Sequence, residues 1–273
     1  MIKSQLKKAI LSKKFLIIIF IGILIHILGG YNEIHKYLFF DYSSADIQTP
    51  QLQAKSRLMV KNGLNMYSVW FDSLLLYTPF MPIMAALPFS LSYLDDVKNG
   101  MIKYIDVRIN HKKYLVAKLL TNGLAGGIAV SFPTIILTII VKIFFGGSID
   151  TFWAKGIYGG FFSKLLIYNF NLYVIVHIFI EFMFGFAYAG IALAVSSFIK
   201  NTIAVMISPF LFWIGGDLIL QSFGIQSYLP TVINQFYLLP TVTFNEIIIE
   251  LGCITLFFSA IFIFKSRKKN IYE

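Results

Sequence analysis

The feature that most constrains this chain is a set of long apolar runs that carry few or no charged side chains. Residues 119–141, for example, contain no Asp, Glu, Lys or Arg. A run of this length is enough to cross the hydrocarbon core of a bilayer as a helix, which takes about 20 residues. Of the 273 residues, 58% are hydrophobic and 13% are charged, about half the charged share of an average soluble domain. We therefore exclude a water-soluble fold and predict an all-α integral membrane protein.

Six runs of this kind divide the chain. The predicted transmembrane helices are residues 15–30, 71–93, 119–141, 172–198, 202–220 and 246–264. They leave no room for a sizeable soluble domain, so residues 1–273 are predicted to form a single transmembrane domain. The second run contains Pro79, Pro82 and Pro88. Because proline removes a backbone donor, this helix is expected to be kinked or locally unwound.

The formal net charge of +10 comes from 23 basic and 13 acidic residues. Sixteen of the 23 basic residues fall in segments that six crossings place on the same side as the N-terminus, which predicts that both termini are cytoplasmic. Topology thus explains the basic balance without a nucleic-acid partner. Residues 1–14 alternate lysines with apolar residues, a spacing that favours a short amphipathic, interfacial helix in contact with membrane lipids.

Residues 94–118 are predicted to form a charged cytoplasmic segment between the second and third transmembrane helices. Within it, Ile102, Tyr104 and Ile105 are interleaved with charged residues such as Arg108. Because transmembrane helices hold it at both ends, such a segment is suited to dock on a soluble partner. The alternative is a solvated loop whose basic residues only set the topology. The spacing alone leaves both interpretations open.

This segment resembles that of the ABC-2 type permeases, the membrane subunits of ATP-binding-cassette exporters. In that family an acidic residue is followed by a glycine and then by a basic, apolar stretch that ends in a lysine. The matching positions here are Asp95, Asp96, Gly100, Arg108, Tyr114 and Lys118. Two further segments are similar to the family: residues 190–209 to a short cytoplasmic turn between two helices, and residues 221–245 to an outer re-entrant hairpin before the last helix. The family's frequent Glu is Asp here, and its common central proline is missing.

The resemblance implies the permease subunit of an exporter, which is not itself an enzyme. The chain has no G-x-x-x-x-G-K-[ST] phosphate loop, so ATP and Mg would be bound by a separate cytoplasmic ABC ATPase, present in two copies. This chain would pair with a second permease, identical or related, in a bacterial plasma membrane, and would hold no cofactor or metal of its own. The residues expected to couple to the ATPase are Asp95, Asp96, Gly100, Ile102, Tyr104, Ile105 and Arg108.

The expected cargo is a hydrophobic or amphipathic molecule, foremost a peptide such as a toxin or an antimicrobial, with lipids or drugs as the alternative. A different class stays open as well. The chain would then be an ion-coupled secondary transporter, or a membrane immunity or sensor protein that transports nothing. A gene for an ABC ATPase next to the gene for this chain would favour the exporter.

Four ionisable residues inside the predicted spans are candidate cavity or substrate residues. His177 and Glu181 are four residues apart and therefore share one helix face, while Asp217 and Glu250 lie near the outer ends of their helices. Such residues are costly in a membrane and are functional candidates by default. With Glu181, the two outer acids would favour a cationic amphipathic cargo. A structural hydrogen bond between His177 and Glu181 is the alternative.

Other polar and small residues in the spans favour structural roles. His26 is expected to be a packed histidine, because no Cys, Asp or Glu accompanies it at metal-ligand spacing. The small-residue pairs with the spacing of close helix contacts are Gly123 and Gly127, Gly185 and Ala189, and Gly190 and Ala194.

Overall fold

The computed structural model describes residues 1–44, 47, 49–145 and 158–267, which contain helices and turns but no β-strand. The helices are α1 (Ile2–Ile10), α2 (Lys13–Leu38), α3 (Pro50–Gly63), α4 (Met66–Tyr77), α5 (Met81–Ala86), α6 (Ser92–Lys98), α7 (Met101–Arg108), α8 (His111–Phe144), α10 (Ser163–Tyr168), α11 (Phe170–Val195), α12 (Thr202–Ser222), α13 (Pro230–Asn234) and α14 (Phe244–Lys265). The all-α class is therefore confirmed.

Six helical segments of the described chain are long and apolar enough to cross a membrane, as the sequence predicts. They are Lys13–Leu38, Met66–Ala86, His111–Phe144, Phe170–Val195, Thr202–Ser222 and Phe244–Lys265. The first span ends eight residues after its predicted end at residue 30, the third begins eight residues before its predicted start at residue 119, and the second begins five residues before its predicted start at residue 71. Asn65 causes this earlier start, because its side chain accepts hydrogen bonds from the backbone N–H groups of Tyr67 and Ser68 and so caps α4.

The prolines of the second span interrupt it, which confirms the expected local unwinding. A 3-10 turn at Thr78–Phe80 separates α4 from α5. The span then ends at Ala86 rather than at residue 93, just before Pro88. A proline is poorly tolerated inside a helix because it has no N–H to donate and its ring clashes with the preceding turn.

Helix α11 is the centre of the bundle, and it packs against α5, α8, α12 and α14. On the other side of α8, α2 packs along both α4 and α8. The first helix, α1, ends just before Ser12, which caps α2, and it buries Ala9 against Phe89 and Ala125, while its lysines are exposed. Residues 2–10 therefore form the predicted amphipathic helix, and its position on a membrane surface stays a prediction.

Glycines allow α8 and α11 to approach closely. A Cβ added at Gly126 would lie 2.8 Å from the carbonyl oxygen of Gly185, and one at Gly185 would lie 2.6 Å from that of Gly126. Gly123 and Gly127 meet the rings of Phe186 and Phe182. The predicted close contacts are thus confirmed for these helices.

Two details of that contact differ from the small-residue prediction. Gly126, which the spacing did not single out, is the residue whose backbone meets Gly185. Gly190 is not a contact, because a Cβ there would meet no atom within 4 Å. The predicted contact at Gly190 is therefore wrong, although Ala194, one turn later on α11, is buried beside Tyr93 and Phe262.

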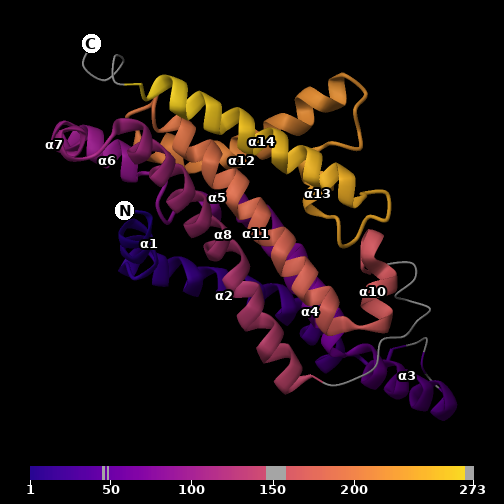
Figure 1. The fold of residues 1–273 in the computed structure, drawn as a ribbon. Coiled ribbons are helices and arrows are strands. Elements are labelled where there is room, and N and C mark those ends of the chain that lie inside the picture. The colour runs from indigo at the N-terminus through magenta and orange to yellow at the C-terminus, as the bar shows by residue number, and fades with distance from the viewer. Residues whose placement is uncertain (45–46, 48, 146–157, 268–273) are drawn as a thin grey trace.

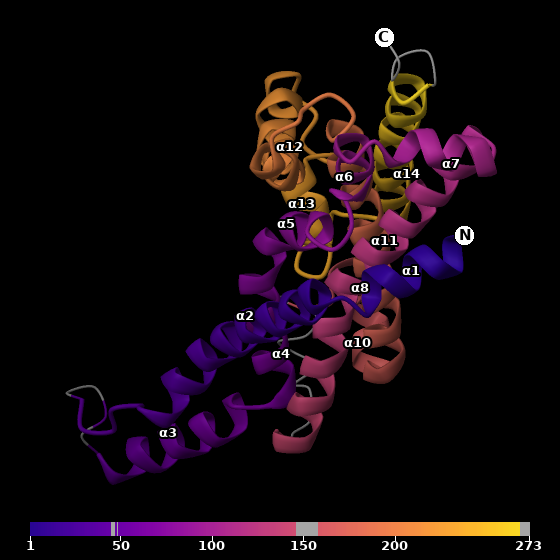
Figure 2. The ribbon, with the colours of Figure 1, turned by 90° about the vertical axis from the view of Figure 1, so that its left-hand side faces the viewer.

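The two ends of the described chain lie toward the same end of the bundle (Figure 1; Figure 2). In both views α1, α7 and the last turns of α14 lie at one end of the bundle, and α3 lies at the other (Figure 1; Figure 2). A hydrogen bond of 2.7 Å from His111 Nε2, at the start of α8, to the carbonyl oxygen of Ser266 joins this end together. This arrangement agrees with two termini on one side of a membrane, and which side it is stays a prediction.

Residues 221–245 connect α12 to α14 through turns and α13, and part of this connection returns into the bundle. Phe236 and Tyr237 are buried in the main core, and the hydroxyls of Tyr237 and Thr78 lie 2.9 Å apart. The segment thus packs on the second span. Its predicted re-entrant path through the outer membrane surface stays a prediction.

The close contact between α8 and α11 leads us to expect that one methyl group added at Gly185 lowers the stability of the protein. The Gly185→Ala variant is expected to lose about 1–3 kcal/mol of stability, because the methyl group meets backbone that no side-chain rotation can move. The matched variant Gly190→Ala adds the same methyl group to open space on the same helix and is expected to be neutral or slightly stabilising. Thermal unfolding midpoints in detergent measure both, and equal midpoints would contradict the contact.

Candidate functional site

The first candidate site is a helical hairpin formed by α6 and α7. The turn between them requires Gly100, whose φ of 65° lies in the left-handed region that other residues rarely adopt. This turn lets two short helices project from the end of the bundle before α8 begins at His111. The predicted segment 94–118 is therefore mostly helical, and it includes the first two turns of α8.

The apolar residues of α7 divide into an anchor and an exposed face. Ile102 is buried in a small core with Tyr93 of α6, Leu115 of α8 and Phe262 of α14. Tyr104 is 71% exposed and Val107 is 86% exposed. Of the residues predicted to couple to a partner, Ile102 thus holds the hairpin, whereas Tyr104 is free to contact another molecule. The predicted Ile105 is half-buried, and the predicted Arg108 is exposed.

A buried ion pair fixes α6 against α8. Lys118 Nζ lies 2.7 Å from Asp96 Oδ2 and donates a hydrogen bond of 3.1 Å to the carbonyl oxygen of Ser92. The hydroxyl of Tyr114 donates to the same carboxylate oxygen at 2.7 Å. Three of the positions that match the ABC-2 pattern are thus joined. Asp95, next to this pair, is exposed.

His111 ties the hairpin to the last helix, a contact that the sequence did not indicate. Its Nδ1 lies 2.8 Å from Asp106 Oδ1 of α7, and its Nε2 lies 2.7 Å from the carbonyl oxygen of Ser266. The ring thus joins the C-terminal half of α7 to the residue that follows α14.

A cavity of about 450 Å³ lies beside α6, where α1 joins α2. Its charged lining residues are Lys8, Lys13, Lys14, Asp95, Asp96 and Lys118. Lys118 is already paired with Asp96, so the remaining lysines give the cavity a positive character. This surface adjoins the α6–α7 hairpin.

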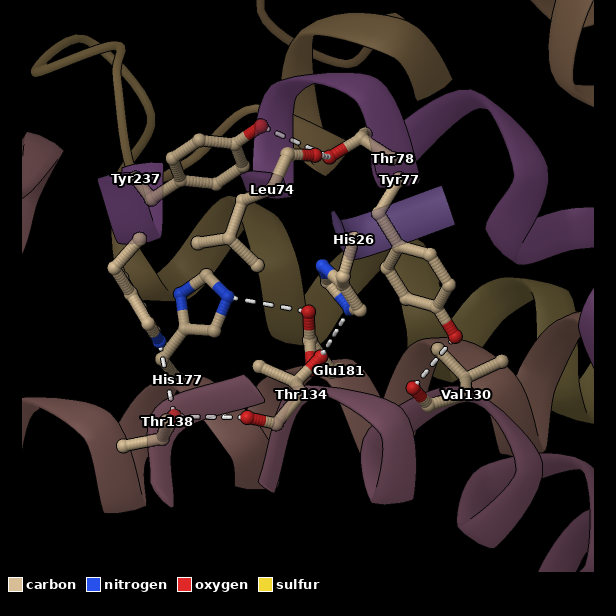
Figure 3. Close-up of polar contacts among 11 residues, drawn as sticks. His26, Leu74, Tyr77, Thr78, Val130, Thr134, Thr138, His177, Glu181 and Tyr237 are labelled. Carbon is tan, nitrogen blue, oxygen red and sulfur yellow. Dashed lines mark hydrogen bonds and ion pairs between the residues drawn. The ribbon is translucent and has the colours of Figure 1, made fainter. Parts of the chain in front are cut away.

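The second candidate site is a buried polar cluster between α2, α4, α8 and α11 (Figure 3). His177 Nε2 lies 3.2 Å from Glu181 Oε1, and both side chains are fully buried. The His177 ring is enclosed by Trp70, Phe236 and Tyr237, with ring centroids 4.9 to 5.4 Å away. The predicted pairing of His177 with Glu181 on one helix face is present.

Hydrogen bonds around this pair join helices that are far apart in sequence. His26 Nε2 lies 3.2 Å from Thr134 Oγ1, and its ring lies 4.0 Å from that of Tyr77. His26 is therefore a packed histidine, as predicted. Trp70 Nε1 donates to Thr138 Oγ1 at 2.9 Å, and the Tyr77 hydroxyl donates to the Val130 carbonyl at 2.8 Å (Figure 3).

Three polar atoms of this cluster have no hydrogen-bond partner in the described part of the chain. They are His26 Nδ1, His177 Nδ1 and Glu181 Oε2. His177 and Glu181 line neither the cavity beside α6 nor the cavity near Glu250. The described residues also contain no group of three or more His, Cys, Asp or Glu side chains that could hold a metal ion. The hydrogen bonds of the cluster favour a structural role in joining α2, α4 and α8.

The third candidate site contains Asp217 of α12 and Glu250 of α14. Asp217 accepts hydrogen bonds from the backbone N–H and the hydroxyl of Thr231, at the start of α13. Glu250 is 8% exposed, and its carboxylate interacts electrostatically with that of Asp217. Glu181 pairs with His177 instead, so the structure arranges the three predicted acids as one close pair and one separate residue.

Comparisons of this chain with protein-family models, with curated proteins and with solved structures gave no match.

The buried pair predicts a coupled effect of two substitutions. The His177→Leu variant is expected to lose about 3 kcal/mol of stability, because Glu181 then stays buried without a partner. The double variant His177→Leu/Glu181→Leu is expected to regain most of that loss, since two apolar side chains of similar size replace the pair. Thermal unfolding of the wild type, both single variants and the double variant measures this coupling. Losses that simply add would contradict it.

Proposed function

We propose that this chain is the membrane permease subunit of an ATP-binding-cassette exporter. The observation that carries the proposal is the α6–α7 hairpin, which projects an exposed face from the end of the bundle while its other face is held by buried contacts. Tyr104 and Val107 lie on the exposed face, and Ile102 and the pair of Asp96 with Lys118 anchor the hairpin. A rigid element of this kind can couple a conformational change in a bound soluble partner to the helices that hold it.

The partner in this proposal is a cytoplasmic ATPase that binds ATP and Mg, present in two copies. The sequence has no phosphate loop, so the energy for transport is supplied from outside this chain. The positive cavity beside α6 and the exposed Arg108 favour an acidic contact surface on that ATPase. The end of the bundle that carries α7 is then cytoplasmic, as the distribution of basic residues predicts.

A second permease, identical or related, completes the exporter in this proposal. Only 17% of the apolar window of α12 and 28% of that of α14 is buried, compared with 61% for α11. Their exposed apolar surfaces need lipid or another protein chain to cover them. We place the second permease against part of this surface, in a bacterial plasma membrane.

The proposed cargo is a hydrophobic or amphipathic molecule, foremost a peptide such as a toxin or an antimicrobial, with a lipid or a drug as the alternative. The small extramembrane part of the described chain supports this choice, because it contains no soluble domain that would bind a large polar cargo.

An ion-coupled secondary transporter is the second candidate, and one observation favours it. Glu181 Oε2 and His177 Nδ1 are buried without hydrogen-bond partners among the described residues, so this pair has capacity to bind and release a proton. Transport that depends on a pH gradient and not on ATP would support this candidate over the exporter. Loss of transport after depletion of ATP at a constant pH gradient would support the exporter.

If the exposed face of α7 binds the ATPase, acidic substitutions on this face are expected to weaken that binding. The double variant Tyr104→Asp/Val107→Asp is expected to fold normally, because both side chains are exposed. The amount of ATPase that co-purifies with it is expected to fall at least about tenfold, because acids replace two apolar contacts. Affinity purification in mild detergent from cells that co-express an ABC ATPase measures this loss.

Tyr168→Asp is the matched control for this experiment. Tyr168 is 87% exposed, on α10, away from α7, so its variant is expected to retain the ATPase. Ile102 is not suitable for the test, since an acid at this buried position would disturb the small core beneath α7. Equal recovery of the ATPase from the wild type and the Tyr104→Asp/Val107→Asp variant would contradict the proposed contact.

A further inference from the structure

A small apolar cavity lies between α12, α13 and α14, and an acidic side chain forms part of its wall. The cavity has a volume of about 320 Å³, at the lower end of the range for small-molecule sites. Phe212 and Ile219 of α12, Pro230 of α13 and Ile254 of α14 contribute apolar walls. Glu250 is the only acidic residue that lines this cavity, and no Lys, Arg or His lines it.

The carboxyl group of Glu250 lacks the partners that a buried acid requires. More than nine-tenths of its surface is buried, and neither of its oxygens has a hydrogen-bond partner among the described residues. None of the ion pairs found in the described part of the chain involves Glu250 or Asp217. A buried carboxyl group without a partner is neutral unless a cation joins it, and a bound cation would supply the partner that Glu250 lacks.

Two neighbouring groups add to this preference for a cation. Asp217 brings a second negative charge close to Glu250, and Thr231 satisfies only part of its hydrogen-bonding capacity. The hydroxyl of Tyr188, on α11, is also buried without a partner and interacts electrostatically with both acids. Neither Asp217 nor Tyr188 lines the cavity, so Glu250 is the acidic group in its wall, and α12 and α14 offer apolar contact.

We propose that this cavity binds a small amphiphile that carries a protonated amine, with its ammonium group on Glu250 and its apolar part between α12 and α14. An ammonium group has three N–H donors and no acceptor, which complements the carboxyl group of Glu250, whose oxygens have no partner among the described residues. The proposal names the substrate class of the exporter, and in this respect it rests on the proposed function. The acyl chain of a membrane lipid is the competing occupant. It has no donor and would leave Glu250 without a partner.

Cys253 provides a reporter for the experiment, because it is the only cysteine of the chain, lines this cavity and is exposed. The full-length chain in phosphatidylcholine nanodiscs at pH 7 is alkylated with N-ethylmaleimide, with and without octylammonium. At about ten times its Kd, octylammonium occupies about nine-tenths of the sites and is expected to slow alkylation about tenfold. 1-Octanol has the same chain and no charge, and it is expected to leave the rate unchanged.

The variant Glu250→Gln is expected to lose the protection by octylammonium. Glu246→Gln is the matched control, because Glu246 lies one turn earlier on α14 and hydrogen-bonds to Thr243 rather than lining the cavity. It is expected to keep the protection. Equal protection by 1-octanol, or full protection of Glu250→Gln, would overturn the proposal and indicate an apolar occupant such as a lipid chain.

The assay uses neither an ATPase nor ATP, so its outcome is independent of the α7 contact. If the ATPase is lost from the Tyr104→Asp/Val107→Asp variant but octylammonium gives no protection, the exporter proposal is supported and the amine site is overturned. If octylammonium protects Cys253 but no ATPase co-purifies with the wild type, the amine site is supported and the exporter proposal is overturned.

Discussion

The close approach of α8 and α11 is the constraint on which the rest of the fold depends. Gly126 and Gly185 bring the two backbones together, and Asn122 of α8 donates a hydrogen bond of 2.7 Å to the Ala189 carbonyl of α11. Lipid gives no hydrophobic drive for two helices to associate, so small residues and interhelical hydrogen bonds determine which helices meet. Helices α5, α12 and α14 pack on α11, and α2 and α4 pack on α8. Both halves of the bundle are therefore positioned by this one contact.

The buried polar cluster strengthens the same arrangement from the α2 side. In an apolar interior a hydrogen bond has few competitors, and an unpaired polar atom is costly. His26 with Thr134 and Trp70 with Thr138 therefore define how α2 and α4 sit against α8. His177 and Glu181 add a polar pair within α11 at the centre of this region. Specific polar contacts thus determine register where apolar surfaces alone would allow the helices to slide.

Much of the fold was predictable because the signals for it are local. A run of about 20 uncharged residues indicates a membrane-spanning helix without knowledge of any neighbour. Pro79, Pro82 and Pro88 likewise predict an interrupted helix, and His177 and Glu181 share a face through the helix period alone. The class, the six long helices, the interruption and this pair are therefore found in the structure.

The rest depends on which helices meet, and that is not a local property. Gly190 has the same spacing signal as Gly185 but faces open space, and Gly126 makes the closest backbone contact without such a signal. Ile102 reads as part of an amphipathic docking face, yet Phe262, 160 residues later, covers it. His111 looks like a loop residue until the end of α14 is placed beside it. Each of these depends on residues distant in sequence, so the pattern around the position could not show it.

Helix α14 connects two of the candidate sites. At one end, Phe262 packs on Tyr93 with ring centroids 5.0 Å apart, and the Ser266 carbonyl accepts from His111. Three turns earlier, Glu250 lines the cavity between α12 and α14. Helix α14 runs without interruption from Phe244 to Lys265, so one continuous element joins the core beneath α7 to the wall that contains Glu250. Because α14 also packs along α11, both ends of this element rest on the same central helix.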